Sequence, residues 1–256
     1  MTGSGSNKED AMSKIWLITG ASRGLGREIA RAARDAGATV VATARSPAAV
    51  REAFGGEQDR LHAFALDITD AQAANAVAAE TVKRFGAIDV LVNNAGYAEL
   101  GFFETFTDAA VRRQFDVNLF GTMNVARAVA PHMRARRSGL IVTISSVSGL
   151  VSNAGGAIYS ASKFAVEGWM EGFAQELAPL GVRSLLVEPG MLFNLSTYTL
   201  TAHFEWDHLL GQARRRAQAA PGDRGGRHAF ARLLFSRGQA AMFEQDFRTA
   251  ERFLGE

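Results

Sequence analysis

The chain of 256 residues contains no cysteine. This absence excludes disulfide bridges, thiolate-bound zinc and a cysteine nucleophile. Long apolar runs are also missing, because no stretch approaches the roughly 18 to 20 residues that a membrane-spanning helix needs. We therefore expect a cytoplasmic chain without a membrane span. Apolar residues still make up 47% of the sequence, which is enough for the core of one large α/β domain or two small ones.

A strong charge of one sign is absent as well. The 28 Lys and Arg residues nearly balance the 26 Asp and Glu residues, so the pI of about 9.2 reflects a small basic excess. A nucleic-acid-binding protein typically has a basic stripe, which most of this chain lacks, and we expect no nucleic-acid partner. The acidic residues and His203 and His208 do not have the spacing of a metal site, so we expect no metal.

Six short apolar runs alternate with stretches of helical periodicity. The runs, rich in Val, Ile and Leu, are KIWLIT, TVVATA, LHAFAL, IDVLVN, GLIVTIS and VRSLLVE. Consecutive apolar positions are typical of strands that are covered on both faces. The repeated strand–helix units predict an α/β fold, a doubly wound (Rossmann-type) parallel sheet of six or seven strands with helices on both faces. Ligands of such sheets bind beyond the carboxyl ends of the strands.

The two ends of the chain do not follow this pattern. Residues 1–12 are small and polar, and we expect a flexible N-terminal extension there. We interpret residues 13–256 as a single domain in which residues 191–256 form an atypical substrate lid and C-terminal segment. Residues 211–256 contain nine Arg, no Lys and five acidic residues. Two stretches in this part have the spacing of amphipathic helices, and no seventh strand is recognisable.

A glycine-rich sequence, TGASRGLG at residues 19–26, follows the first apolar run and leads directly into a helix. Gly20, Gly24 and Gly26 have the spacing G-x-x-x-G-x-G, which differs from the G-x-G-x-x-G of the longer dinucleotide folds. Glycine permits positive φ and lets main-chain N–H groups approach a pyrophosphate at the N-terminus of the next helix. On its own this loop is also compatible with a merely structural turn.

Taken together with four further motifs, the loop resembles that of the short-chain dehydrogenase/reductase family. These motifs are NNAG at 93–96, FDVNLFG at 115–121, ISSVSG at 144–149 and the pair Tyr159 and Lys163, and the resemblance runs from about residue 14 to 191. It implies an oxidoreductase that transfers a hydride between a nicotinamide cofactor and a ketone, aldehyde or secondary alcohol, with apolar compounds as the broad substrate class. We also expect a homodimer or homotetramer.

The resemblance further implies which residues hold the cofactor. Asp67 would help form the adenine pocket, although an aspartate here also suits the cap of the next helix. After the second run, Ala44 and Arg45 provide no carboxylate to repel a 2′-phosphate. Arg45 and Arg23 can bind that phosphate, so we expect NADP(H), although solvated surface arginines would look the same. The expected cofactor-binding residues are Gly20, Ser22, Arg23, Gly24, Leu25, Gly26, Arg45, Asp67, Ile68, Asn94, Ala95, Gly96, Tyr159, Lys163, Pro189 and Gly190.

Tyr159 and Lys163 are the centre of the expected chemistry, since a helix places residues four apart on one face. A nearby ammonium should favour the phenolate and lower the pKa of Tyr159. Tyr159 would then pass a proton to or from the substrate oxygen. The resemblance implies that Lys163 also holds the nicotinamide ribose and that Ser146, with Ser145 as the competing choice, orients the substrate oxygen. It gives Asn118 a place in a water-linked proton path to Lys163.

The sequence departs from the family pattern after Gly190. Asn194 stands where a threonine commonly contacts the carboxamide, with Ser196 and Thr197 close by. Six apolar residues could line a substrate pocket or simply pack against the core: Met191, Leu192, Phe193, Tyr198, Phe204 and Trp206. Two other functions stay open. One is reduction of 3-oxoacyl thioesters, for which the tail arginines could receive an acidic carrier, and the other is a non-catalytic NADP(H)-binding regulator.

Overall fold

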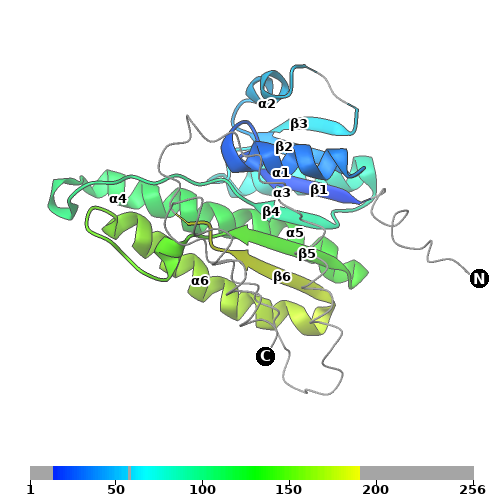
Figure 1. Ribbon diagram of the computed structural model, residues 1–256. Helices are drawn as coiled ribbons and strands as arrows, with labels where there is room; N and C mark the ends of the chain where they lie inside the picture. The colour runs from blue at the N-terminus through cyan, green and yellow to red at the C-terminus, as the bar shows by residue number, and fades with distance from the viewer. Residues whose placement is uncertain (1–13, 57–58, 191–256) are drawn as a thin grey trace, which may run out of the picture.

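The computed structural model describes residues 14–56 and 59–190, in which six strands form one parallel sheet (Figure 1). The strands are β1 (Ile15–Thr19), β2 (Thr39–Ala44), β3 (Leu61–Ala65), β4 (Val90–Asn93), β5 (Gly139–Ile144) and β6 (Val182–Val187). Each predicted run forms one strand, and the doubly wound fold is confirmed. The expectations for residues 1–12 and 191–256, the missing seventh strand among them, lie outside the described residues.

The strand order is β3-β2-β1-β4-β5-β6, so the chain reverses its direction of winding between β1 and β4. β1 pairs with both of these neighbours, with Leu17 opposite Val41 in β2 and Leu91 in β4. A reversal of this kind separates the loops that follow the two central strands and leaves a crevice for a ligand at their carboxyl ends. The glycine loop follows β1, and the NNAG motif ends β4.

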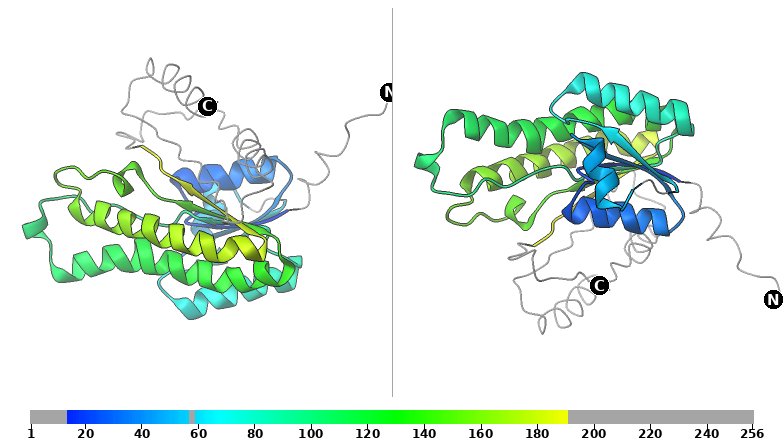
Figure 2. Two further views of the ribbon diagram at one scale, coloured as in Figure 1. Left: turned by 90° about the horizontal axis from the view of Figure 1, so that it is seen from below. Right: turned by 90° about the horizontal axis from the view of Figure 1, so that it is seen from above.

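Helices lie on both faces of the sheet, as Figure 2 shows: α3, α5 and α6 on one face and α1 on the other. The helices are α1 (Gly24–Asp35), α2 (Pro47–Ala53), α3 (Ala71–Phe85), α4 (Asp108–Phe115), α5 (Thr122–Arg136) and α6 (Ala157–Leu177). A π-helical turn, η2 (Asp116–Gly121), joins α4 to α5. Three short 3₁₀ turns complete the described elements: η1 (Phe103–Thr105), η3 (Val147–Gly149) and η4 (Ala178–Leu180).

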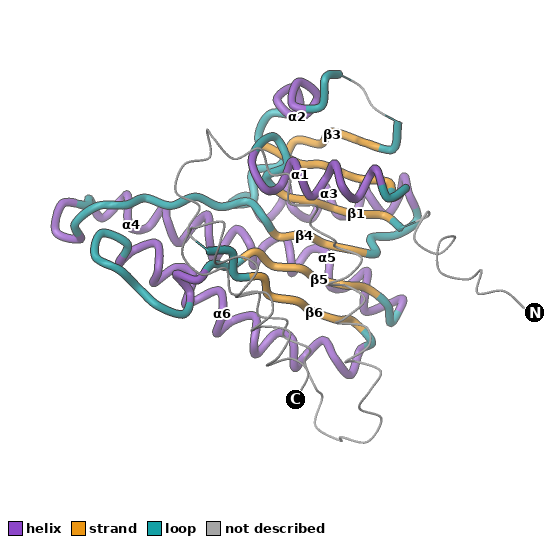
Figure 3. Tube along the Cα trace, in the orientation of Figure 1, coloured by secondary structure: helices purple, strands orange, loops and turns teal. Residues whose placement is uncertain are grey.

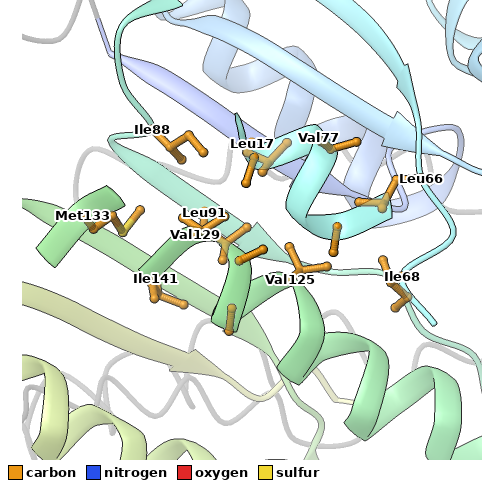
Figure 4. Packing of buried hydrophobic residues seen from close by; sticks show 14 of the residues in the cluster. Leu17, Leu66, Ile68, Val77, Ile88, Leu91, Val125, Val129, Met133 and Ile141 are labelled. Carbon is orange, nitrogen blue, oxygen red and sulfur yellow. The ribbon is translucent and has the colours of Figure 1, made fainter. Parts of the chain in front are cut away.

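The larger of the two cores lies between the sheet and the layer of α3, α5 and α6 (Figure 4). Leu17, Leu91 and Ile141 on three neighbouring strands face Val129 and Met133 of α5 in this core. Their full burial removes a large apolar area from water, at about 25 cal/mol per Å². This packing sets the position of α5 and α6 relative to the strand ends, where the candidate site lies.

The start of α3 corrects one expectation about Asp67. The N-cap of this helix is Asp70, whose carboxylate accepts hydrogen bonds from the backbone N–H groups of Gln72 and Ala73. Asp67 instead accepts from the backbone and the hydroxyl of Thr69, at 3.0 and 2.7 Å. The helix begins three residues later than a cap at Asp67 would require, which leaves Asp67 in the loop after β3.

Beyond the carboxyl ends of the strands, α4 and the beginning of α6 project past the sheet (Figure 1). The loops that follow β4 and β5 run out along them (Figure 3), and the N–H of Gly101 bonds to the carbonyl of Gly155 across the two loops. Among residues 14–56 and 59–190, no helix is long and apolar enough to span a bilayer. The same residues contain no cluster of three or more His, Asp or Glu side chains suited to a metal ion.

Candidate active site

The glycine loop makes a tight turn between β1 and α1. Gly20 has a φ of +67°, and a Cβ there would lie 2.9 Å from the Cα of Ala95. At Gly26 a Cβ would lie 2.5 Å from the carbonyl oxygen of Gly20 and would also collide with Asn94. Side chains at these two positions would push the loop away from β4. Both glycines are therefore required by close packing inside the turn.

Asn94 holds this loop against β4. Its side-chain amide donates to the carbonyl of Thr19 at 2.9 Å and to that of Gly20 at 3.3 Å. The Thr19 hydroxyl accepts the N–H groups of Asn94 and Ala95, both at 3.0 Å, and donates to the carbonyl of Val92. Two residues of the expected cofactor set, Asn94 and Ala95, thus bind the strand end that begins the glycine loop.

The outer side of the same loop is open and electropositive. A Cβ at Gly24, where φ is +56°, would meet nothing within 4 Å. Arg23, the N-cap of α1, provides no side-chain cap, and the first turn of α1 contains no acidic residue. The first N–H groups of a helix lack intrahelical partners and carry partial positive charge. A diphosphate group fits this open, uncapped helix end, and Ser22 and Leu25 lie in the same turn.

Arg45 and Asp67 follow the ends of the neighbouring strands β2 and β3. Both side chains are exposed. The pKa of Asp67 is lowered first by the hydrogen bonds from Thr69, and the positive charge of Arg45 lowers it further. The two charged residues are therefore close enough to interact at the edge where an adenosine would lie. Ile68, by contrast, is buried in the core, and its carbonyl accepts from Asn124.

Tyr159 lies in the first turn of α6, half-buried. Burial raises the pKa of Tyr159, and a hydrogen bond with Ser146 partly opposes that increase. The expectation that Lys163 lowers this pKa is therefore wrong for the described structure. The Lys163 Nζ lies 5.9 Å from the centre of the Tyr159 ring. It donates a hydrogen bond of 2.9 Å to the carbonyl of Ile144, so the ammonium is directed toward the end of β5.

Lys163 is buried one turn beyond Tyr159 on the same helix. Burial lowers its pKa from 10.5 to about 8, because the charged ammonium loses its hydration, while the Coulombic attraction of Glu167 works in the opposite direction. At neutral pH the ammonium form still dominates. A proton that leaves this group near pH 8 is well suited to a transfer path.

Of the two candidate serines, Ser146 is the one beside the phenol. It caps η3, where its hydroxyl accepts from the N–H of Ser148 at 3.1 Å, and it bonds with Tyr159. Ser145 is also buried, but its hydroxyl lies next to Gly149 and Glu167.

Asn118 occupies the π-helical turn between α4 and α5. Its Oδ1 accepts from the N–H of Tyr97 at 3.0 Å, and its Nδ2 donates to the carbonyl of Tyr97 at 2.9 Å and to Ser162 Oγ at 3.0 Å. Such turns widen a helix locally and are frequent at functional sites. A Cβ on Gly96 would lie 3.1 Å from Asn118 Oδ1 and 3.9 Å from Lys163 Nζ. The missing side chain of Gly96 thus leaves space between the two.

Two residues that support Asn118 were not recognised in the sequence. Gln114, one turn before Asn118, donates to the carbonyl of Tyr97 and accepts from the N–H of Glu99, both at 2.8 Å. Ser162 accepts from Asn118 and donates to the carbonyl of Tyr159 at 2.7 Å. The only sequence signal for this arrangement is the spacing of Gln114 and Asn118, four residues apart.

The last expected cofactor residues follow β6. The carbonyl of Pro189 accepts from the N–H of Val147, and that of Val187 accepts from Ser145 at 2.7 Å, which joins the end of β6 to the end of β5. Gly190 is the last described residue. Asn194, Ser196, Thr197 and the six apolar lid candidates lie outside the described residues.

Comparison with known proteins assigns this arrangement to a family. The model of the family described as short chain dehydrogenase matches residues 14–202. The chain belongs to this family. Proteins of the short-chain dehydrogenase family are oxidoreductases that use nicotinamide cofactors, and the recognition made from the sequence motifs is confirmed.

Individual members resemble this short-chain dehydrogenase over most of its length. It is 40% identical to oxidoreductase BOA17 of Botryotinia fuckeliana over 182 residues, which cover 70% of this chain and 66% of the relative. A short-chain dehydrogenase structure from Streptomyces avermitilis has a TM-score of 0.71 and 37% identity, covering 94% of this chain and 93% of that one. A metagenomic short-chain oxidoreductase in complex with NADP has a TM-score of 0.65 and 38% identity, covering 71% and 85%.

The curated relatives are longer than the segment of each that this chain matches. The chain spans 60–66% of the length of the first four that it matches. Family membership establishes the fold of the described residues. It does not decide the activity of the whole protein, the cofactor preference, the substrate or the roles of individual residues.

Proposed function

We propose that the chain is an NADP(H)-dependent reductase or dehydrogenase that acts on a ketone, an aldehyde or a secondary alcohol. The observation that carries this proposal is the group of polar side chains that meets beyond the ends of β4 and β5. It comprises Tyr159 bonded to Ser146, Lys163 one turn further along α6, and Asn118 across the gap left by Gly96. The glycine loop lies at the neighbouring strand end, which is where a nicotinamide dinucleotide would approach this group.

The protonation states favour carbonyl reduction. Since burial raises the pKa of Tyr159, the phenol keeps its proton at neutral pH and can donate it to a carbonyl oxygen. Ser146, already bonded to the phenol, would orient that oxygen. The cofactor, when bound, supplies the hydride that reaches the carbonyl carbon. Lys163 would hold the ribose hydroxyls and, with Asn118, return a proton to Tyr159.

The preference for NADP(H) rests on Arg45. Solved structures similar to the chain include both an NADP complex and an NAD⁺-bound xylitol dehydrogenase, so family membership does not decide the cofactor. Arg45 is exposed at the end of β2, and Arg23 is exposed in the glycine loop. Both are available to a 2′-phosphate, and a charge-assisted hydrogen bond of this kind contributes about 1.5 to 3 kcal/mol.

Cofactor-induced thermal stabilisation tests this preference. NADPH should raise the melting temperature more than NADH at equal concentration, because a ligand bound only by the folded chain stabilises it according to its Kd. Arg45→Asp should weaken NADPH binding by about tenfold or more and leave NADH binding nearly unchanged. Arg127→Asp, at an exposed position on α5, is the control for a change of surface charge alone. An equal response to both cofactors in the wild-type chain would contradict the preference.

An apolar carbonyl compound is the substrate class that the loops beside the site suit best. Leu100, Phe102 and Phe103 after β4 and Val151 after β5 are large, apolar and exposed, and Gly101 and Gly155 link these two loops. A curated relative with 37% identity over 177 residues is a 3-ketodihydrosphingosine reductase of Bacteroides thetaiotaomicron, whose name describes a ketone on a lipid. The predicted homo-oligomer and cytoplasmic location stay predictions.

The activity is tested by following NADPH absorbance with a panel of aliphatic and cyclic ketones, aldehydes and 3-oxoacyl thioesters. We expect turnover of an apolar ketone, reduced by about 10²- to 10⁴-fold in Tyr159→Phe, which loses only the proton donor. Tyr97→Phe, which keeps the backbone bonded to Asn118, is the matched control and should retain activity. Turnover of thioesters alone would point to the second enzyme function. Tight NADPH binding without turnover of any carbonyl would point to a regulator.

A further inference from the structure

The face of α6 that carries Tyr159 and Lys163 continues to a third ionisable residue. Glu167 follows Lys163 by four positions, as Lys163 follows Tyr159, so the three residues occupy successive turns of one helix face. A carboxylate four residues after a lysine on a helix lies within reach of its ammonium. Neither the cofactor nor the proton transfer proposed above uses Glu167.

Glu167 reaches the same strand end as Lys163. A Cβ on Gly149 would lie 3.0 Å from Glu167 Cγ, 3.2 Å from its Oε1 and 3.0 Å from Ser145 Oγ. The carboxylate and the Ser145 hydroxyl therefore both lie beside Gly149. Lys163 Nζ bonds to the carbonyl of Ile144, the residue before Ser145. The Lys163 ammonium thus lies at Ile144 and the Glu167 carboxylate lies near Ser145, the next residue along the chain.

Other charged residues near this face are less suited to act on Lys163. The charged residues of α4 and η2 are Asp108, Arg112, Arg113 and Asp116, and all are exposed, as is Arg183 in β6. Water screens exposed charges strongly. Glu188 is fully buried at the end of β6 and is the one competitor among the described residues of these elements. The electrostatic influence that acts on the Lys163 ammonium comes from Glu167.

We propose that Glu167 is a positioning residue: its carboxylate keeps the buried Lys163 charged and holds it at the end of β5. The catalytic meaning of this inference rests on the proposed function, but the interaction itself does not. Burial by itself works against the ammonium, as the pKa of about 8 shows, and a further decrease of this pKa by about one unit would leave about half of Lys163 neutral near pH 7. A neutral amine would bind ribose hydroxyls less strongly and would have no proton to return to Tyr159.

The first test titrates Lys163 directly and needs no substrate. The chain has only four lysines, Lys8, Lys14, Lys83 and Lys163, so ¹³C labelling at Cε gives four NMR signals. Lys163→Met identifies the signal of interest by its disappearance. Glu167→Gln should lower the titration midpoint of Lys163 by about one pH unit, the low end of the effect of a neighbouring opposite charge. Glu171→Gln, an exposed position one turn further along α6, is the matched control and should leave it unchanged.

Several results of this titration would overturn the inference. The first is a Lys163 midpoint in Glu167→Gln within about 0.3 pH unit of wild type. The second is an equal shift of that midpoint in Glu171→Gln, and the third is a shift that only Glu188→Gln produces. Glu167→Asp keeps the charge and should lie closer to wild type than Glu167→Gln does. If Glu167→Gln fails to fold, the carboxyl carbon of Glu167 is followed in the wild-type chain, and a neutral carboxyl at pH 7 would equally overturn the inference.

The second test measures the pH profile of turnover and separates this inference from the proposed function. With an accepted ketone and NADPH, Glu167→Gln should move the alkaline limb of kcat to lower pH by the same amount as the NMR midpoint. A merely structural role would lower kcat at every pH without moving the limb. Absence of any wild-type turnover would refute the proposed function and leave the NMR result to decide on Glu167. An NMR shift without a moved limb would show that Glu167 sets the charge of Lys163 but not the reaction, and would refute its positioning role.

Discussion

Gln114 offers the sharpest test of how the loop after β4 is held. Its side chain is fully buried, and its amide makes two hydrogen bonds of 2.8 Å, one from its Nε2 to the carbonyl of Tyr97 and one to its Oε1 from the N–H of Glu99. Gln114→Met keeps the length of the side chain and removes both bonds. The Tyr97 carbonyl retains its hydrogen bond from Asn118, whereas the Glu99 N–H loses its acceptor, Gln114 Oε1.

The expected cost follows from these two losses. Each bond contributes about 1 kcal/mol net, and the Glu99 N–H is only partly buried, so water can replace some of what it loses. Together they predict a decrease of about 2 kcal/mol in the free energy of unfolding, which corresponds to a melting temperature about 4 to 8 °C lower for a chain of this size. Because Asn118 is bonded to the same loop, kcat should also fall, by about ten- to a hundredfold.

Urea unfolding and steady-state kinetics check the two parts of this prediction. Gln175→Met, at an exposed position on α6, introduces the same side chain without touching the loop and should behave like wild type. A stability loss in Gln114→Met below about 0.5 kcal/mol would show that the two short bonds add little. An unchanged kcat together with the expected stability loss would show that the loop does not position Asn118.

Two further predictions concern the serines and the buried lysine. Ser146→Ala should lower kcat by about 10²-fold, because this hydroxyl bonds with Tyr159. Ser145→Ala should lower kcat by less than about threefold, because Ser145 lies beside Gly149. If kinetic assays gave the reverse order, the roles of the two serines would be exchanged. Burial lowers the pKa of Lys163 to about 8, so on raising the pH the folded chain releases this proton before the unfolded chain does. The free energy of unfolding should therefore rise with pH between about 8 and 10, by at most about 1.4 kcal/mol per pH unit. Urea unfolding at pH 7.5 and 9.5 should show that Lys163→Met lacks this rise, and an equal rise in both proteins would contradict the buried-ammonium argument.

Much of the fold was predictable because its signals are local. Strands covered on both faces need consecutive apolar residues, and the six runs such as IDVLVN contain them in succession. The alternation of runs with helical periodicity left few possible topologies, since crossovers between parallel strands are almost always right-handed. The pairing of β1 with both β2 and β4 follows from that topology.

The corrections arise where the outcome depended on surroundings. The spacing of Tyr159 and Lys163 correctly indicated one helix face, but the pKa of Tyr159 rises because burial outweighs an ammonium that is bonded elsewhere. Asp67 was compatible with a helix cap, and only the observed start of α3 assigns that cap to Asp70. In both cases a competing partner, the carbonyl of Ile144 or a second aspartate, decided the result.

By itself the sequence determined the family, the six strands, the glycine turn and the set of residues at the strand ends, since each of these depends on residue type and spacing along the chain. Tertiary structure alone decided which serine meets the phenol, where the ammonium of Lys163 is directed, and that Gln114, Ser162 and Glu167 surround the site. These contacts join residues that are mostly distant in sequence. Their hydrogen bonds and charges depend on distances of a few ångströms, which exist only after α4, α5 and α6 pack against the sheet.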